Sequence, residues 1–240
     1  MVISMNEYKG FSYYFDQIME YIDYHDWLSF TKEYVKKDKT ILDLACGSGT
    51  LAVLLSVEGY NVDGLDLSAE MIGLANDKFK AYHILNNLYT CDMSSFSLPN
   101  KYDAITCYFD SINHLPTIEH VRKMMDCVYD TLNDDGLFIF DVFSKSKYDD
   151  MDNTDISEEF DDFAYNWKIT LKKPNVLTHD ITIIGDNNIH EIYNEYYYDI
   201  EDFINLDKFE IIKICGDFND DLTKDDERIL VVLKKLAQKD

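Results

Sequence analysis

Basic residues are scarce in this chain of 240 residues: 22 Lys and Arg stand against 46 Asp and Glu, which gives a formal net charge of −24. Nucleic-acid binding draws most of its affinity from Lys and Arg side chains that neutralise phosphates. No run of basic residues interrupts the acidity. We therefore expect no nucleic-acid partner and favour a small-molecule ligand.

Cysteine patterns that bind metals are also missing. The five cysteines form no Cys-x-x-Cys pair and no other spacing typical of metal ligands. Most of them lie inside apolar runs, so we interpret them as buried thiols in a reducing compartment. The sequence predicts no metal site.

Long apolar runs, internal repeats and Pro/Gly/Ser-rich linkers are absent from the sequence. No stretch approaches membrane-spanning length, and no basic region followed by an apolar segment opens the chain. Hydrophobic residues still make up 46% of the total, enough for a sizeable core. We expect a soluble, cytoplasmic protein without a membrane partner, folded as a single domain over residues 1–240.

What the sequence does contain is an alternation of short apolar strands and amphipathic helices. An aromatic helical cap is predicted over residues 1–37, with its helix from about 10 to 37. Five strands follow, at 40–44, 60–65, 88–91, 102–108 and 137–142, with helices near 50–58, 68–79 and 117–132. This alternation predicts right-handed crossovers and a doubly wound, Rossmann-like α/β sheet.

The pattern changes after about residue 147. An acidic stretch at 149–162 is interpreted as a solvated loop, with a lid over the substrate as the alternative. Three segments of period two, at 163–172, 176–184 and 189–198, are separated by turn residues at Pro174-Asn175 and 185–188. We predict an inserted antiparallel β meander over 149–198. A short helix at 199–206 and strands at 209–215 and 228–233 complete the chain.

The strongest motif follows the first strand, in Asp43-Leu-Ala45-Cys-Gly47-Ser-Gly49. Glycines in such a turn let the backbone approach a ligand at the carboxyl end of a strand, where open α/β sheets bind ligands. Asp43 can accept hydrogen bonds from a cationic amino group. S-adenosylmethionine carries such a group and NAD does not.

Two further acids end the next two strands. Asp66 is placed to accept both hydroxyls of a ribose. Asp92 is placed to accept from an adenine amino group, with Leu67 and Met93 on the two faces of the ring. Acids after three successive strands are more specific than a glycine turn, which alone would also fit a dinucleotide site.

With these motifs the chain resembles the class I S-adenosylmethionine-dependent methyltransferases, over nearly its whole length. Further motifs that carry the resemblance are Tyr102-Asp-Ala-Ile-Thr106 in the fourth strand and Asp135-Gly-Leu-Phe-Ile-Phe140 in the fifth. The resemblance implies a seven-stranded sheet whose last strand is antiparallel. It also implies S-adenosyl-L-methionine as the cofactor. The contacts it predicts, beyond the acids and loop already named, are Ala45, Met71 and Tyr108.

Within the class, the chain is similar to small bacterial enzymes of unassigned substrate and to glycine- and sarcosine-type N-methyltransferases. In the latter an N-terminal Tyr and Trp help to close over the cofactor, which makes Tyr13 and Trp27 the matching candidates. The Asn/Asp-Pro-Pro-Tyr motif of enzymes that methylate nucleic-acid amino groups is replaced here by residues 109–112, Phe-Asp-Ser-Ile. This departure argues against a base as the acceptor.

Acceptor-side residues are predicted after the fourth strand and on the meander. Asp110 and His114 are candidate proton acceptors, if one is needed. Asn113, Trp167 and Tyr14 are candidate substrate contacts, although turn capping or core packing would also explain them.

The sequence thus predicts methyl transfer to an oxygen or nitrogen of a small molecule. Two alternatives stay open: an NAD-dependent oxidoreductase, and a non-catalytic module that keeps the fold and binds a protein. The oxidoreductase would explain the glycine turn and Asp66, but not Asp43 or Asp92.

Overall fold

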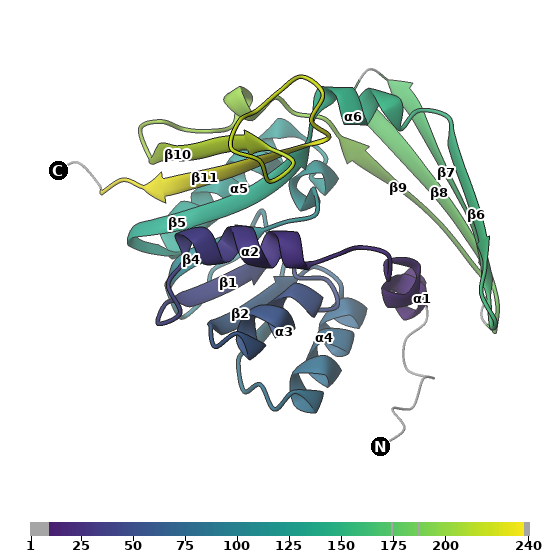
Figure 1. Cartoon of the computed structure of the whole chain (residues 1–240), viewed down its shortest axis with the longest axis horizontal. Coiled ribbons are helices and arrows are strands. Elements are labelled where there is room, and N and C mark those ends of the chain that lie inside the picture. The colour runs from purple at the N-terminus through teal and green to yellow at the C-terminus, as the bar shows by residue number, and fades with distance from the viewer. Residues whose placement is uncertain (1–9, 174, 187, 238–240) are drawn as a thin grey trace.

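Two separate sheets organise the computed structural model, which describes residues 10–173, 175–186 and 188–237 (Figure 1). The larger sheet has seven strands in the order β10-β11-β5-β4-β1-β2-β3. Its strands are β1 (Thr40–Leu44), β2 (Asn61–Asp66), β3 (Leu88–Thr90), β4 (Tyr102–Cys107), β5 (Leu132–Phe143), β10 (Phe209–Gly216) and β11 (Arg228–Lys235). β11 is antiparallel to both of its neighbours, whereas β1 to β5 run parallel. The predicted doubly wound α/β fold with an antiparallel last strand is confirmed.

Helices cover both faces of this sheet because successive residues of its inner strands point to opposite sides. Ile41 packs with residues of α2 (His25–Tyr34) and α3 (Thr50–Val57). Leu42, the next residue, packs with α5 (Ile118–Thr131) on the other face. α4 (Ala69–Ala81) starts where its Ser68 hydroxyl accepts from the Met71 amide, as the sequence predicts.

The second sheet is the predicted meander, with four antiparallel strands in the order β6-β7-β8-β9. They are β6 (Thr154–Glu159), β7 (Ala164–Lys173), β8 (Val176–Ile184) and β9 (Ile189–Tyr196), reached through α6 (Lys145–Asp150). The aromatic helix α1 (Phe11–Ile18) lies between the two sheets (Figure 1). Tyr14 and Ile18 of α1 share a buried cluster with residues of the meander. Residues 1–9 of the predicted cap, Pro174 and Asn187 lie outside the described residues.

Three predicted elements differ in the structure. The helix predicted over 10–37 is two helices, because the Asp23 carboxylate accepts from the His25 amide and starts α2 there. The acidic stretch is no loop: it holds β6, whose backbone pairs with β7 while its acidic side chains stay in solvent. The helix predicted at 199–206 is shorter, a single 3₁₀ turn η2 (Ile200–Asp202), and the residue that follows it, Phe203, is buried in the core.

β5 also begins earlier than its apolar run suggests. Tyr102 pairs with Leu132 and Ala104 with Leu137, so four residues bulge out between these pairs. Asp135, in this bulge, has φ 60°. Among the described helices, none is long and apolar enough to cross a membrane.

Candidate active site

The glycine turn lies at the carboxyl end of β1, in the middle of the large sheet. Gly49 has φ 77°, and a Cβ there would stand 2.8 Å from the Cβ of Ala75 in α4. Gly47 has φ 54° and open space above it. The turn therefore needs one glycine for close helix packing and leaves the other free to approach a ligand.

Asp43 is the buried acid of this turn, with 4% of its surface exposed. Its Oδ1 accepts from the Thr106 hydroxyl of β4 at 2.8 Å. Burial raises the pKa of Asp43 to about 7. A cationic ligand group beside Asp43 would favour its charged form.

Asp66 ends β2, the neighbouring strand, and its carboxylate organises the same edge. One oxygen accepts from the Gly47 amide and the other from the Ser68 amide, both at 2.8 Å. Burial raises the pKa of Asp66, while these amides and the nearby His114 oppose the rise. Each carboxylate oxygen keeps a further lone pair, so the ribose contact stays available.

Asp92 follows β3, the next strand outward, and is exposed. Its Oδ1 accepts from the amide and hydroxyl of Ser94. Near it, Leu67 is 71% exposed and Met93 is partly buried against the core. Because β1, β2 and β3 are adjacent and parallel, the three predicted acids share one edge of the sheet.

The helix α1 is tied directly to the glycine turn. Asp16 accepts from the Ser48 hydroxyl at 2.6 Å and pairs with Lys78 of α4 at 2.7 Å. Lys78 also donates to Ser48 and Thr50. The sequence analysis did not single out Asp16 or Lys78, since their contact depends on helices 62 residues apart. Tyr13 of α1 is partly buried and meets Tyr14 edge-on.

Trp27 and Tyr108, two predicted cofactor contacts, are buried in the fold. The Trp27 Nε1 donates to Asp141 at 2.6 Å, and its ring stacks on Phe109. The Tyr108 hydroxyl shares a hydrogen bond with Thr31 of α2. Both side chains are thus buried and have partners within the fold, and their contact with the cofactor stays a prediction.

Behind the end of β4 the backbone takes a rare conformation. Phe109 and Asp110 have φ of 57° and 49°, which is uncommon outside glycine. Buried Asp141 accepts from the Asp110 amide at 2.8 Å, and Arg228 pairs with both carboxylates. Burial raises the pKa of Asp110, and the Arg228 charge opposes this rise. Strained residues of this kind gather at functional sites.

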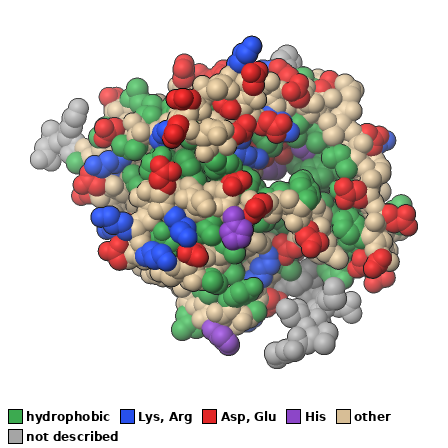
Figure 2. Space-filling view, in the orientation of Figure 1, with side chains coloured by type: hydrophobic (Ala, Val, Ile, Leu, Met, Phe, Trp, Pro, Cys, Tyr) green, Lys and Arg blue, Asp and Glu red, His purple; other side chains and the backbone are tan. Residues whose placement is uncertain are grey.

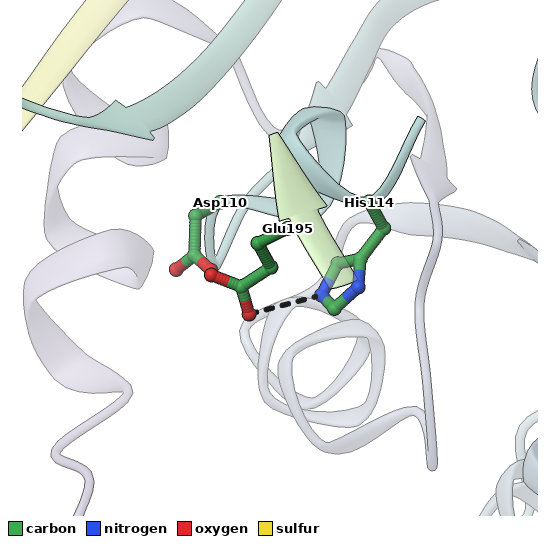
Figure 3. Close-up of side chains that lie close together, drawn as sticks. All are labelled: Asp110, His114 and Glu195. Atoms are coloured by element: carbon green, nitrogen blue, oxygen red, sulfur yellow. Dashed lines mark ion pairs between the residues drawn. The ribbon is translucent and has the colours of Figure 1, made fainter. Parts of the chain in front are cut away.

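Asp110 and His114, the candidate proton acceptors, meet a third residue that the sequence analysis missed. Asp110 precedes the 3₁₀ turn η1 (Ser111–His114), His114 is its last residue, and Glu195 reaches both from β9 (Figure 3). One ligand atom from each of the three residues lies within 4.8 Å of the other two. We name Asp110, His114 and Glu195 the acid–histidine cluster.

A sequence signal for Glu195 did exist. Glu195 pairs with the buried Leu177 in the β8–β9 register and is itself only 4% exposed. Alternation along β9 therefore places a glutamate at an inward position, where an apolar residue is usual. Although burial opposes it, the facing imidazole of His179 holds the pKa of Glu195 below its ordinary value.

The predicted substrate contacts have mixed positions. Asn113 is buried and donates to the Tyr196 carbonyl of β9. Trp167 of β7 donates its Nε1 to His179, next to the acid–histidine cluster. Tyr14 is 1% exposed and packs on Phe163, so in this arrangement its ring faces the meander core. Figure 2 shows the molecule hollowed between its two sheets.

Comparisons with known proteins agree with this geometry. The methyltransferase-domain family matches residues 41–136. A protein of Geobacillus sp. (strain WCH70), provisionally named a methyltransferase, is 31% identical over 95% of this chain and 99% of its own.

Two solved structures share the whole fold. An S-adenosylmethionine-dependent methyltransferase from Clostridium acetobutylicum ATCC 824 has TM-score 0.82 and 27% identity, covering 93% of this chain and 96% of its own. A sugar N-methyltransferase from Streptoalloteichus sp. ATCC 53650 has TM-score 0.74 and 17% identity, covering 94% of both chains. The family match, the full-length relative and the shared fold agree with the acids along β1 to β3, and the chain belongs to the S-adenosylmethionine-dependent methyltransferases.

Proposed function

We propose that this enzyme transfers the methyl group of S-adenosylmethionine to a nitrogen of a small molecule bound between the two sheets. The observation that carries the proposal is that Asp43, Asp66 and Asp92 lie at one edge of the sheet, at or just after the ends of three adjacent parallel strands. In this arrangement Asp43 binds the amino group of the cofactor, Asp66 its ribose and Asp92 its adenine.

We favour nitrogen over oxygen as the acceptor atom because the fold is similar to that of a sugar N-methyltransferase. The sugar N-methyltransferase covers 94% of this chain, so the likeness includes the meander as well as the cofactor domain. Asp110 and His114 stay the proposed contacts of the acceptor, because they follow β4, the strand beside β1, and lie together with Glu195 of the meander. The acceptor would therefore sit beside the methyl group.

The transfer itself needs little more than alignment. The acceptor lone pair forms the new bond to the methyl carbon, the carbon–sulfur bond breaks, and sulfur keeps the electron pair. The amine then loses one proton. Positioning of this kind can lower a barrier by about 7–11 kcal/mol at best. The chain supplies it by holding the cofactor at the β1–β3 edge and shielding the reacting atoms between two sheets.

The direct test is a calorimetric titration of the purified protein with S-adenosylmethionine and S-adenosylhomocysteine, with NADH as control. We expect micromolar binding of the first two compounds only. Asp66→Ala should weaken both by more than about tenfold, because the ribose and the Gly47 amide lose their acceptor. Unchanged affinity in this variant would remove the ribose assignment.

The acceptor atom is tested separately with a cofactor that carries a trideuterated methyl group. The enzyme is incubated with pooled small-molecule extracts. Fragmentation of each labelled product in a mass spectrometer then shows which atom carries the labelled methyl group. Label on nitrogen supports the proposal. Label on oxygen or carbon would contradict it while leaving the cofactor assignments intact.

A further inference from the structure

Unpaired buried polar atoms concentrate at one place on the acceptor side. Among the described residues, four buried side-chain atoms lack a hydrogen-bond partner within ordinary distance. Two of them, Oδ1 of Asn113 and Oε2 of Glu195, lie on the acceptor side, and a third, Nε2 of His179, faces Oε1 of Glu195 at 3.4 Å. Asn113 donates to the carbonyl of Tyr196, the residue after Glu195. Buried polar atoms are nearly always paired in native proteins. Their concentration here points to a ligand.

The hydrogen bonds around Glu195 show which of its oxygens is open. Trp167 donates to Nδ1 of His179, so the neutral imidazole of His179 carries its proton on Nε2. That nitrogen faces Glu195 Oε1 at 3.4 Å. Glu195 Oε2 is left without a partner, although 96% of the residue is shielded from solvent.

The charges at this place leave room for a cation. Asp110, Asp141 and Glu195 are all buried carboxylates. Arg228 pairs with Asp110 and Asp141 and its charge also reaches Glu195. The groups that face Glu195 directly are the imidazoles of His114 and His179, which are cations only when protonated. Three buried carboxylates therefore share one permanent cation among these described residues. Two carboxylates this close repel each other unless a proton or a cation lies between them.

We propose that the acid–histidine cluster of Asp110, His114 and Glu195 binds one divalent first-row transition-metal ion, such as Zn²⁺ or Co²⁺. An imidazole with two carboxylates suits these ions better than Mg²⁺ or Ca²⁺, which prefer oxygen alone. Metal–ligand bonds of about 2.0–2.2 Å place ligand atoms closer than the 4.8 Å that spans the cluster. A small contraction would complete the site.

A neighbouring side chain, His179, orients the proposed ligand Glu195, as residues around metal ligands commonly do. His179 faces Oε1 of Glu195 at 3.4 Å, on the same oxygen that His114 approaches at 3.7 Å, and so holds the carboxylate in place while Oε2 keeps no partner. The His114 side chain is 45% exposed, so one side of the cluster stays open. When bound, the ion would supply a Lewis acid beside the acceptor. That role rests on the proposed function, whereas metal binding itself does not.

The test is a titration of the full-length protein with Co²⁺ followed by visible absorption, and with Zn²⁺ followed by calorimetry. We expect one equivalent to bind, with a Co²⁺ spectrum of oxygen and nitrogen ligands and no thiolate band. Glu195→Gln and His114→Gln should each weaken binding at least tenfold. Thermal melts check that both variants are folded, and cofactor titrations show separately whether the methyl-donor site is intact.

The matched control is His190→Gln. His190 also lies on β9 and faces an acid, Asp180 at 2.9 Å, but both side chains are exposed. This variant should bind the metals as the parent does. Absence of saturable binding, binding unchanged in Glu195→Gln and His114→Gln, or a thiolate spectrum would overturn the site.

Discussion

At the residue scale, the buried carboxyl group of Asp43 has a raised pKa, because its charged form is poorly solvated. The pKa of Asp43 is raised by burial to about 7, whereas an unfolded Asp titrates near about 3.9. The folded chain therefore binds a proton that the unfolded chain has lost over this range. The contribution of Asp43 to stability is full below the unfolded pKa and decreases as the pH rises toward 7.

Cofactor affinity should therefore depend on pH through Asp43. Between pH 5.5 and 7, affinity for S-adenosylmethionine should rise by up to about tenfold per unit, because only the ionised carboxylate pairs with the amino group. Calorimetric titrations at several pH values measure this. Asp43→Asn should bind weakly at every pH, and a slope that persists in this variant would assign the titration to another group.

The same substitution should stabilise the cofactor-free enzyme at alkaline pH. Asparagine keeps an acceptor for the Thr106 hydroxyl and removes the buried charge. We expect Asp43→Asn to melt at a higher temperature than the parent at pH 8, and at a similar temperature at pH 5. Thermal melts at the two pH values check this, and a lower melting temperature at pH 8 would show that the charge has a structural partner.

At the scale of elements, α1 belongs to both halves of the molecule. Asp16 holds it on the glycine turn, whereas Tyr14 and Ile18 bury its other side in the meander. The Phe11 amide also donates to Glu191 of β9. Residues 19–24, which no long helix stiffens, connect α1 to α2.

Loosening this helix should change cofactor kinetics more than stability. Asp16 and Lys78 are partly exposed, and such ion pairs contribute only about 0–1 kcal/mol to folding. We expect Asp16→Asn to release S-adenosylhomocysteine several times faster in stopped-flow experiments, with an almost unchanged melting temperature. Asp149→Asn, which breaks an exposed pair with Lys145 in α6, is the control. Equal release rates for all three proteins would exclude a closing role for α1.

At the scale of the whole molecule, like charges surround the core. Figure 2 shows acidic side chains spread over the face in view, and the net charge is −24. Such charge destabilises a compact state through self-repulsion. At 0.1 M salt, the repulsion between exposed charges more than about 10 Å apart is largely screened.

The melting temperature should consequently rise as sodium chloride increases from 20 to 500 mM, by a few degrees or more. Sucrose at equal osmolality is the control for general solvent effects. A melting temperature that falls with salt would mean that specific ion pairs outweigh the repulsion.

Features that lie within one strand and the turn after it could be predicted from the sequence, because residues close in the chain carry the whole signal. Asp43, Gly47 and Gly49 form one continuous motif, and the strand pattern placed Asp66 and Asp92 at the same edge. Glu195 was missed because it is 81 residues from His114, and only the packing of the meander on η1 brings them together. Short elements were also missed, because the backbone pairing of β6 overrides its acidic composition.

The position of α1 between the sheets has a thermodynamic consequence. If the methyl donor binds at the glycine turn and the acceptor at the meander, as proposed, α1 contacts both sites and cannot adjust to one ligand without shifting its contacts to the other. Occupancy of the two sites is then coupled, and coupling free energies are reciprocal. Whatever factor S-adenosylhomocysteine contributes to acceptor affinity, the acceptor contributes to S-adenosylhomocysteine affinity. A rise in that affinity can therefore reveal the natural acceptor before any turnover is observed.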